Sequence, residues 1–166
     1  MPENFNPDKG SIPEGSSTEL SAGNNANFKV NGNGDIDLEG DVKAEAGEVT
    51  ATISGKGNIT VGNEAGEAKT TIAAKKNVAL ETKEGDITVA KGIKSTEESV
   101  SVATGKGNIT VGREGTVDGE TIKAQKNVTV GTDLGTIYIL GKTITEDGDI
   151  TMKAGKEIYE EGTDKC

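Results

Sequence analysis

The chain has 166 residues, a net charge of −10 and few aromatic residues, with two Phe, two Tyr and no Trp. This acidic balance argues against nucleic acid and anionic membrane surfaces as partners, because phosphate binding needs clustered Lys and Arg. The sequence contains no run of 18 apolar residues, so no membrane insertion is expected.

The first 18 residues differ in composition from the rest of the chain. They contain all three prolines together with several Gly and Ser, and they show no apolar alternation, which is typical of a flexible lead-in. We therefore predict a lead-in over 1–18, a repeat domain over 19–162 and a tail over 163–166. The single cysteine, Cys166, lies in that tail and cannot close a disulfide within the chain.

From Leu20 onward, apolar residues alternate with polar ones in short stretches. Alternation with a period of two is typical of a strand with one buried face, and helical spacing is sustained nowhere. Val, Ile and Thr favour strands, while Gly, Asn and Asp are typical of the corners between them. The alternating apolar sets are Phe28 and Val30; Ile36 and Leu38; Val49, Ala51 and Ile53; Ile59 and Val61; Ile72 and Ala74; Val78 and Leu80; Ile87 and Val89; Val100 and Val102; Ile109 and Val111; Ile122 and Ala124; Val128 and Val130; Ile137 and Ile139; and Ile150 and Met152.

A long internal repeat organises these strands. Residues 55–62 recur unchanged at 105–112, and the similarity continues beyond them at the same offset of 50. A repeat of this kind indicates one structural unit stacked on copies of itself. The strands sort into three series: Ile36, Ile59, Ile87, Ile109, Ile137 and Ile158; Val42, Ile72, Ile93, Ile122 and Ile144; and Ile53, Val78, Val100, Val128 and Ile150. The sequence therefore predicts an all-β fold, a single-stranded parallel β-helix (a solenoid) with three short strands per coil and about five to six coils.

The spacing within the first series alternates between short steps of 21 to 23 residues and long steps of 28. We attribute the long steps to insertions at 62–69 and 112–119, which we expect to project as loops from the same corner, two coils apart. An antiparallel sandwich of short strands is the rival architecture. It would explain the alternation but not a gapless copy at an offset of 50.

The residue types argue against a catalytic centre. The chain has no His, which removes His-based acid–base catalysis, triads and His metal sites. A glycosidase would need two converging carboxylates and aromatic platforms. The candidates are the carboxylates Glu64, Glu67, Glu114, Asp118 and Glu120, with Tyr138 and Tyr159 as the rings. We interpret these carboxylates as an acidic surface, and we predict no catalytic residues and no cofactor.

A calcium site is the other candidate for chemistry. The stretch 32–38 is similar to the Gly- and Asp-rich nonapeptide that binds calcium between β-roll turns. The positions equivalent to Asp35 carry Asn58, Asp86, Asn108 and Thr136, so the required tandem Asp is missing. The simpler interpretation, a corner followed by a strand, is preferred, and no metal is expected.

Phrases such as Gly57-Asn58-Ile59-Thr60-Val61 and Gly85-Asp86-Ile87-Thr88-Val89, together with 76–80 and 148–152, resemble the degenerate repeats of filamentous haemagglutinin-like exoproteins, adhesins exported by two-partner secretion. The likeness runs from about Phe28 to Ile158. It implies a right-handed parallel β-helix that forms a stiff shaft segment of a bacterial surface fibre, with a ligand on a host or neighbouring cell. A secretion domain, a receptor-binding module and a toxin module are not recognisable.

Two other functions stay open. Bactofilins are also small β-helical proteins with proline-bearing ends, and they imply a cytoplasmic filament that self-associates end to end. Their repeats are shorter and more regular than the 22 and 28 residues seen here. A carbohydrate-active enzyme is the third hypothesis. The first residues lack the basic and apolar regions of a signal peptide, so a secreted or cell-surface location requires an export signal elsewhere, and a cytoplasmic location is the alternative.

Overall fold

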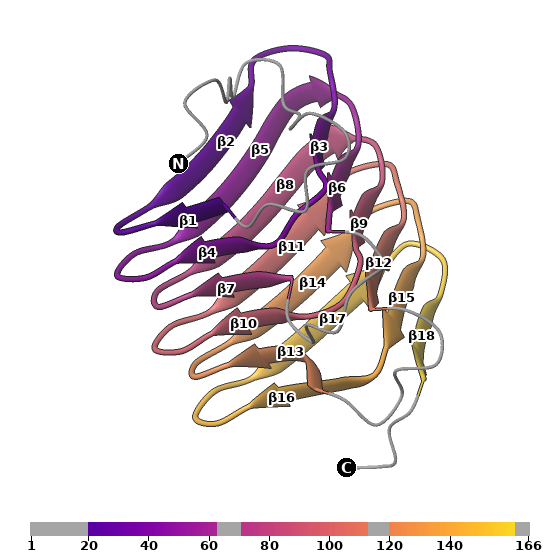
Figure 1. Ribbon diagram of the computed structural model, residues 1–166. Coiled ribbons are helices and arrows are strands. Elements are labelled where there is room, and N and C mark those ends of the chain that lie inside the picture. Colours follow the sequence, from indigo (N-terminus) through magenta and orange to yellow (C-terminus); the bar gives the residue numbers. More distant parts are fainter. Residues whose placement is uncertain (1–19, 63–70, 113–119, 162–166) are drawn as a thin grey trace.

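A computed structural model describes residues 20–62, 71–112 and 120–161, and within these ranges the chain is built from β-strands (Figure 1). The strands form three six-stranded sheets, and each sheet takes every third strand in chain order. The first sheet contains β1 (Leu20–Ala22), β4 (Val42–Ala44), β7 (Ile72–Ala74), β10 (Ile93–Ser95), β13 (Glu120–Ala124) and β16 (Lys142–Thr145). The second contains β2 (Ala26–Val30), β5 (Val49–Lys56), β8 (Val78–Glu84), β11 (Val100–Thr104), β14 (Val128–Thr132) and β17 (Ile150–Ala154). The third contains β3 (Ile36–Leu38), β6 (Ile59–Val61), β9 (Ile87–Val89), β12 (Ile109–Gly112), β15 (Ile137–Leu140) and β18 (Ile158–Glu161).

Successive strands wind around a common axis, so that three strands make one coil and six coils stack on one another (Figure 1). Every strand pair within the sheets is parallel. The predicted β-helix with three strands per coil is confirmed, and the antiparallel sandwich is wrong. The proposed lead-in at 1–18 and the tail at 163–166 lie outside the described residues, so those boundaries stay predictions.

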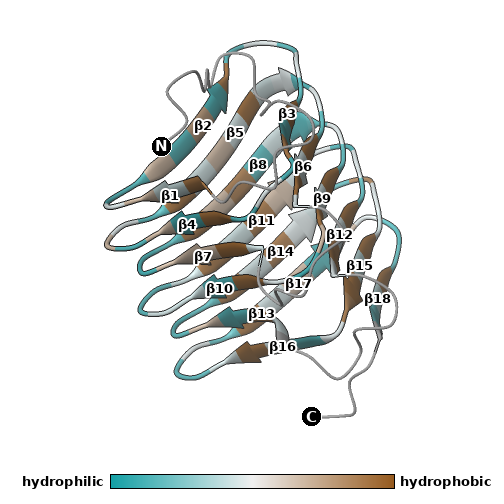
Figure 2. Ribbon diagram, viewed as in Figure 1, coloured by the Kyte–Doolittle hydropathy of each residue, from teal (hydrophilic) through white to brown (hydrophobic). Residues whose placement is uncertain are grey.

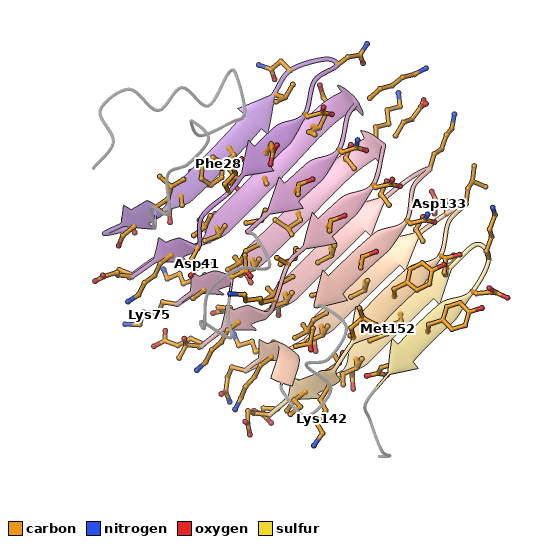
Figure 3. All side chains as sticks on the ribbon, turned by 45° about the vertical axis from the view of Figure 1, so that its right-hand side comes forward. Phe28, Asp41, Lys75, Asp133, Lys142 and Met152 are labelled. Atoms are coloured by element: carbon orange, nitrogen blue, oxygen red, sulfur yellow. The ribbon has the colours of Figure 1, made fainter. Side chains whose placement is uncertain are left out.

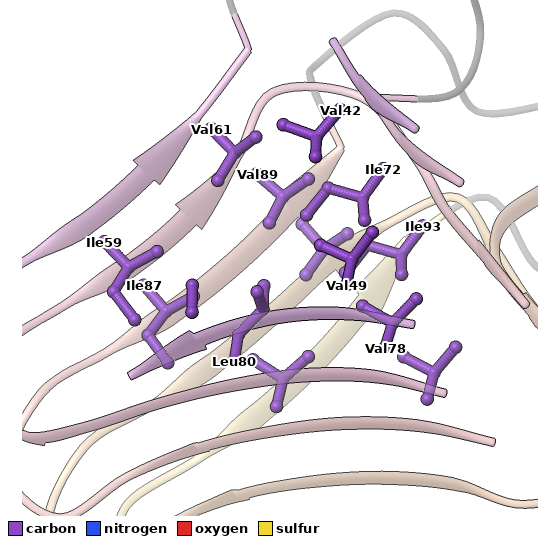
Figure 4. Close-up of a cluster of buried hydrophobic side chains, with 14 of the residues drawn as sticks. Val42, Val49, Ile59, Val61, Ile72, Val78, Leu80, Ile87, Val89 and Ile93 are labelled. Carbon is purple, nitrogen blue, oxygen red and sulfur yellow. The ribbon is translucent and has the colours of Figure 1, made fainter. Parts of the chain in front are cut away.

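The interior is made of aliphatic side chains stacked in vertical rows. Ile59, Ile87 and Ile109 pair in register from one coil to the next, and each is fully buried. Figure 4 shows such rows, with Ile59 next to Ile87 and Val61 next to Val89. Brown inward residues alternate with teal outward ones along the strands (Figure 2). The regular cross-section suits aliphatic residues, which is the physical reason for the low aromatic content.

Two of the predicted rows are corrected by the register. Val49, rather than Ile53, pairs with Val78, and Ile53 pairs instead with Thr82. In the last coil, Ile122 pairs with Thr143, while Ile144 pairs with Lys123.

The two errors have different causes. β5 is eight residues long, and a shift of four residues keeps the same face inward, so alternation alone does not distinguish the two alignments. In the β13–β16 pair, the register shifts between Glu120 and Ile122. A one-residue slip turns every following side chain to the other face.

A column of glycines forms the corner between the second and third sheets. An added Cβ on Gly57, Gly85, Gly107 or Gly135 would lie 1.9–2.0 Å from the carbonyl oxygen of the column glycine one coil earlier. None of these four has a positive φ. Glycine is therefore required here by the close approach of neighbouring coils.

Buried threonines form hydrogen bonds to this corner from the interior of the coil. The hydroxyls of Thr82, Thr104 and Thr132 donate to the carbonyl oxygens of Gly57, Gly85 and Gly107, at 2.8, 2.7 and 2.6 Å. The three threonines pair in register along the second sheet and are almost completely buried. Each hydroxyl is satisfied by a carbonyl that faces the interior, so the polar row does not leave orphaned groups in the core.

Candidate functional site

The corner between the third and first sheets is where the coils differ in length. The chain crosses it in three residues between β3 and β4 and again between β9 and β10, but it takes ten between β6 and β7 and seven between β12 and β13. β9 lies between β6 and β12 in the sheet, so the two long connections leave the same corner two coils apart. The expected position of the insertions, at one corner and two coils apart, is confirmed by their flanking strands. That they project as loops stays a prediction, because 63–70 and 113–119 lie outside the described residues.

These two connections begin in the same way. Gly62, directly after β6, and Gly112, the last residue of β12, have φ values of +83° and +93°. Glycine adopts this region without the steric strain that a Cβ would cause. With strands about 4.8 Å apart in a sheet, the two loops start about 10 Å apart along the stack.

The outward face of the third sheet carries one row of side chains. Asp37, Thr60, Thr88, Thr110 and Tyr138 follow each other in register, and Tyr159 completes the row in the last coil. The two tyrosine rings are stacked, with 5.3 Å between centroids and planes 8° apart. One face of each ring is therefore covered by the other ring, whereas the aromatic platforms of a sugar site are open to the ligand.

Tyr159 also has a polar partner in its own strand region. Its hydroxyl donates to a Glu157 carboxylate oxygen at 2.6 Å. This hydrogen bond and the negative charge of Glu157 raise the pKa of the Tyr159 phenol above its ordinary value. The Tyr159 hydroxyl is thus engaged by a carboxylate at the surface.

The corner residues considered for calcium make hydrogen bonds between successive coils. The Oδ1 atoms of Asp35, Asn58, Asp86 and Asn108 each accept a hydrogen bond from the backbone N–H of the equivalent residue one coil later, at 2.8–2.9 Å. The last of these donors is Thr136. We call this series the corner ladder. The sequence showed the Asn and Asp at equivalent places but not that each joins one coil to the next.

A second series of the same kind runs along the corner between the first and second sheets. Oδ1 of Asn77 accepts from the N–H of Ser99, the hydroxyl of Ser99 accepts from the N–H of Asn127, and Oδ1 of Asn127 accepts from the N–H of Asp149. Distances are 2.9–3.2 Å. Corner backbone groups that the sheets leave unpaired thus find partners across the coils.

Truncating one rung of the corner ladder is expected to destabilise the fold moderately. Asn108→Ala removes the acceptor for the Thr136 N–H, and we expect the free energy of unfolding to fall by about 1 kcal/mol. Asn108→Asp keeps an acceptor, as Asp35 and Asp86 do, so its loss should be smaller. Urea denaturation followed by circular dichroism measures both. Equal losses in the two variants would contradict a ladder role.

Exposed ion pairs also run along the stack. Glu84 lies between Lys56 and Lys106, with N–O distances of 3.7 and 3.3 Å. A hydrogen bond from Lys106 and the positive charges of Lys106 and Lys56 lower the pKa of the Glu84 carboxyl. Exposed pairs of this kind contribute little stability individually. These ion pairs neutralise part of the negative charge of the surface carboxylates, which could otherwise attract a cation.

The carboxylates weighed as a glycosidase pair do not assemble into a described site. Glu64, Glu67, Glu114 and Asp118 lie outside the described residues, and of Glu120 only the backbone, at the start of β13, is described. Across 20–62, 71–112 and 120–161, no three His, Cys, Asp or Glu side chains gather as metal ligands.

One open depression of about 280 Å³ lies at the corner after β10 and β13. Its lining includes Lys94, Lys123 and Glu146, and Glu146 neutralises Lys123 at 3.3 Å. We assign no chemistry to this depression.

The described part of the chain contains no helix long and apolar enough to cross a membrane. Comparisons with protein-family models, with curated proteins and with solved structures found no match. The chain is a parallel β-helix with three strands per coil and about six coils.

Proposed function

We propose that this chain is a non-catalytic structural segment of a bacterial surface fibre or adhesin, a stiff β-helical shaft that displays loops to a ligand on a host or neighbouring cell. The observation that carries the proposal is the pair of long connections that leave one corner of an otherwise regular stack. A rod that holds two segments at a fixed spacing is suited to multivalent contact.

The construction of the rod supports a mechanical role. The interior is a continuous stack of buried Ile, Val, Leu and Ala, and both Asn- and Asp-bearing corners carry hydrogen bonds between coils. Bending the stack would break backbone bonds, corner rungs and core contacts together, so the shaft is expected to be stiff. The net charge of −10 disfavours unspecific association.

The bactofilin-like filament is less well supported, because a growing filament needs an association surface at both ends. The inward side chains of the first described coil, such as Phe28 and Ile36, are buried. An apolar docking surface is therefore lacking on the described residues at that end. We therefore prefer the cell-surface shaft and keep the cytoplasmic filament as the alternative.

Shortening the two loops tests the display role. Residues 62–71 and 113–119 would each be replaced by the three-residue connection Ala90-Lys91-Gly92, which already joins β9 to β10 at the same corner. We expect the doubly shortened protein to keep its circular dichroism spectrum, because the flanking strands are held by neighbouring coils. Binding of the fluorescently labelled protein to epithelial or bacterial cells should fall at least about tenfold.

A matched control changes the shaft and leaves the loops intact. Thr129→Lys alters the exposed outward face of β14 and should leave cell binding unchanged. Unchanged binding after loop shortening, or no binding by the parent protein, would contradict the display role. Cleavage of a sugar polymer by the parent protein would contradict the non-catalytic assignment.

A further inference from the structure

One corner of the first coil contains two asparagines that are each followed by glycine. It is the connection between β2 and β3, at the end of the stack that Phe28 marks in Figure 3. Asn31-Gly32 and Asn33-Gly34 are the two Asn-Gly pairs of the sequence, and every other asparagine is followed by a residue with a Cβ. An Asn-Gly pair is chemically labile, because a glycine nitrogen unhindered by a Cβ can reach the side-chain amide carbon of the preceding asparagine.

The reaction of such a pair is an intramolecular displacement. The glycine nitrogen loses its proton to water or hydroxide and bonds to Cγ of the asparagine, while the Cγ–Nδ2 bond breaks and the nitrogen leaves as ammonia. Water then opens the resulting cyclic imide at either carbonyl, which gives aspartate or isoaspartate. For the ring to close, both the side-chain amide and the following backbone nitrogen must be free to move.

In the second pair, the next coil holds both of these reacting groups. Oδ1 of Asn33 accepts a hydrogen bond from the Lys56 N–H at 2.8 Å, and the Gly34 N–H donates to the Lys56 carbonyl oxygen at 2.9 Å. The Asn33 side chain also lies against Gly55, where an added Cβ would be 2.4 Å from Oδ1. Ring closure at Asn33 therefore requires two hydrogen bonds between coils to break.

The first pair is restrained at one of its two reacting groups only. The Asn31 side chain is exposed, and in the part of the chain that the structure describes its amide makes no hydrogen bond. The Gly32 N–H donates to the exposed Ser54 hydroxyl at 2.8 Å, and ring closure must break this bond. The partners of both pairs belong to the second coil, which is described, so the contrast does not depend on what precedes β1.

We propose that Asn31 is a site of spontaneous deamidation in the folded protein, with water as the co-reactant, and that the bonds to Lys56 protect Asn33. Each event at Asn31 adds one negative charge to a chain whose net charge is −10. The isoaspartate product also lengthens the backbone of the corner by one methylene group. The first coil therefore becomes more acidic with time, whatever the two loops bind.

Peptide mapping of the full chain tests the proposal. After incubation of the folded protein at mildly alkaline pH, unfolding and trypsin digestion release residues 30–43, which contain both asparagines and no other. Fragmentation of this peptide in a mass spectrometer locates the deamidated residue. We expect deamidation at Asn31 to be about tenfold faster than at Asn33, because one hydrogen bond opposes ring closure at Asn31 and two oppose it at Asn33.

The same digestion after incubation in guanidinium chloride separates the effect of the fold from that of the sequence. Glycine follows both asparagines, so their rates should become similar once the hydrogen bonds to Lys56 and Ser54 are lost. A folded protein in which Asn33 reacts as fast as Asn31 would overturn the proposal. So would a ratio of the two rates that the denaturant leaves unchanged.

Two matched variants identify the source of the added charge. Asn31→Asp removes the reacting amide and should abolish the acidic species that forms with time on ion-exchange chromatography. Asn33→Asp adds the same charge and keeps an acceptor for the Lys56 N–H, as Asp35 does for the Asn58 N–H, so it should leave that species unchanged. Formation of the acidic species at the parent rate in Asn31→Asp would contradict the assignment.

Discussion

Gly107→Ala is expected to lower the free energy of unfolding by about 3–5 kcal/mol, a large effect for the addition of one methyl group. The added Cβ would lie 1.9 Å from the carbonyl oxygen of Gly85, well inside van der Waals contact. That oxygen belongs to backbone and also accepts the buried Thr104 hydroxyl, so it cannot move without breaking this bond. Relief requires the two coils to separate at the corner. Urea denaturation measures the loss.

Gly131→Ala is the matched control for this prediction. Gly131 lies in β14, and a Cβ added there would meet the Lys153 carbonyl oxygen at 3.8 Å, an ordinary contact. Its φ is not positive, so alanine fits the backbone, and the change should be neutral or stabilise by up to about 1 kcal/mol. Equal effects of the two substitutions would contradict a cost that arises from the close approach of the coils at Gly107.

Ile87→Ala is expected to lower the free energy of unfolding by about 3 kcal/mol. Ile87 is fully buried between Ile59 and Ile109, which are also fully buried, so the removed atoms leave a cavity in the middle of a row. The flanking coils are joined to each other by three sheets and cannot collapse into the gap without disturbing their register. Ile87→Val, which removes one methyl group, should cost about 1 kcal/mol.

Thr88→Ala provides the comparison on the opposite face of the same strand. Thr88 points outward in the row between Thr60 and Thr110, and its replacement should change stability by no more than about 0.5 kcal/mol. Parallel urea curves with equal slopes would show that the denatured state is unaffected. A loss in Thr88→Ala as large as that in Ile87→Ala would contradict the assignment of the inward face.

The architecture could be predicted from the order of residues alone, because each coil of a stacked fold places similar residues at equivalent positions. Ile59, Ile87 and Ile109 could be placed above one another from spacing and alternation, and the pairing confirms it. The shared corner of the two insertions also followed from spacing, since only a long connection at one fixed place explains steps of 28 beside steps of 22.

The register within long or irregular strands could not be predicted in this way. Val49 and Ile53 face the same way, so either alignment with Val78 satisfies the alternation, and the hydrogen-bonded ladder selects Val49. Ile144 is displaced by a register shift whose cause lies in the neighbouring strand β13. Alternation specifies a face but not a partner, and the partner depends on backbone hydrogen bonds formed between residues far apart in the chain.

The contacts between coils could not be predicted from the sequence either. That Asn108 and Asp86 lie at equivalent corners is readable from the repeat, but their role as acceptors for the next coil depends on distances of about 3 Å. The glycine column and the exposed Ile150 and Ile158 depend in the same way on what lies directly above and below. The type of a residue determines which hydrogen-bonding groups and how much apolar surface it has. The stacking of coils determines which groups of the neighbouring coil these contact.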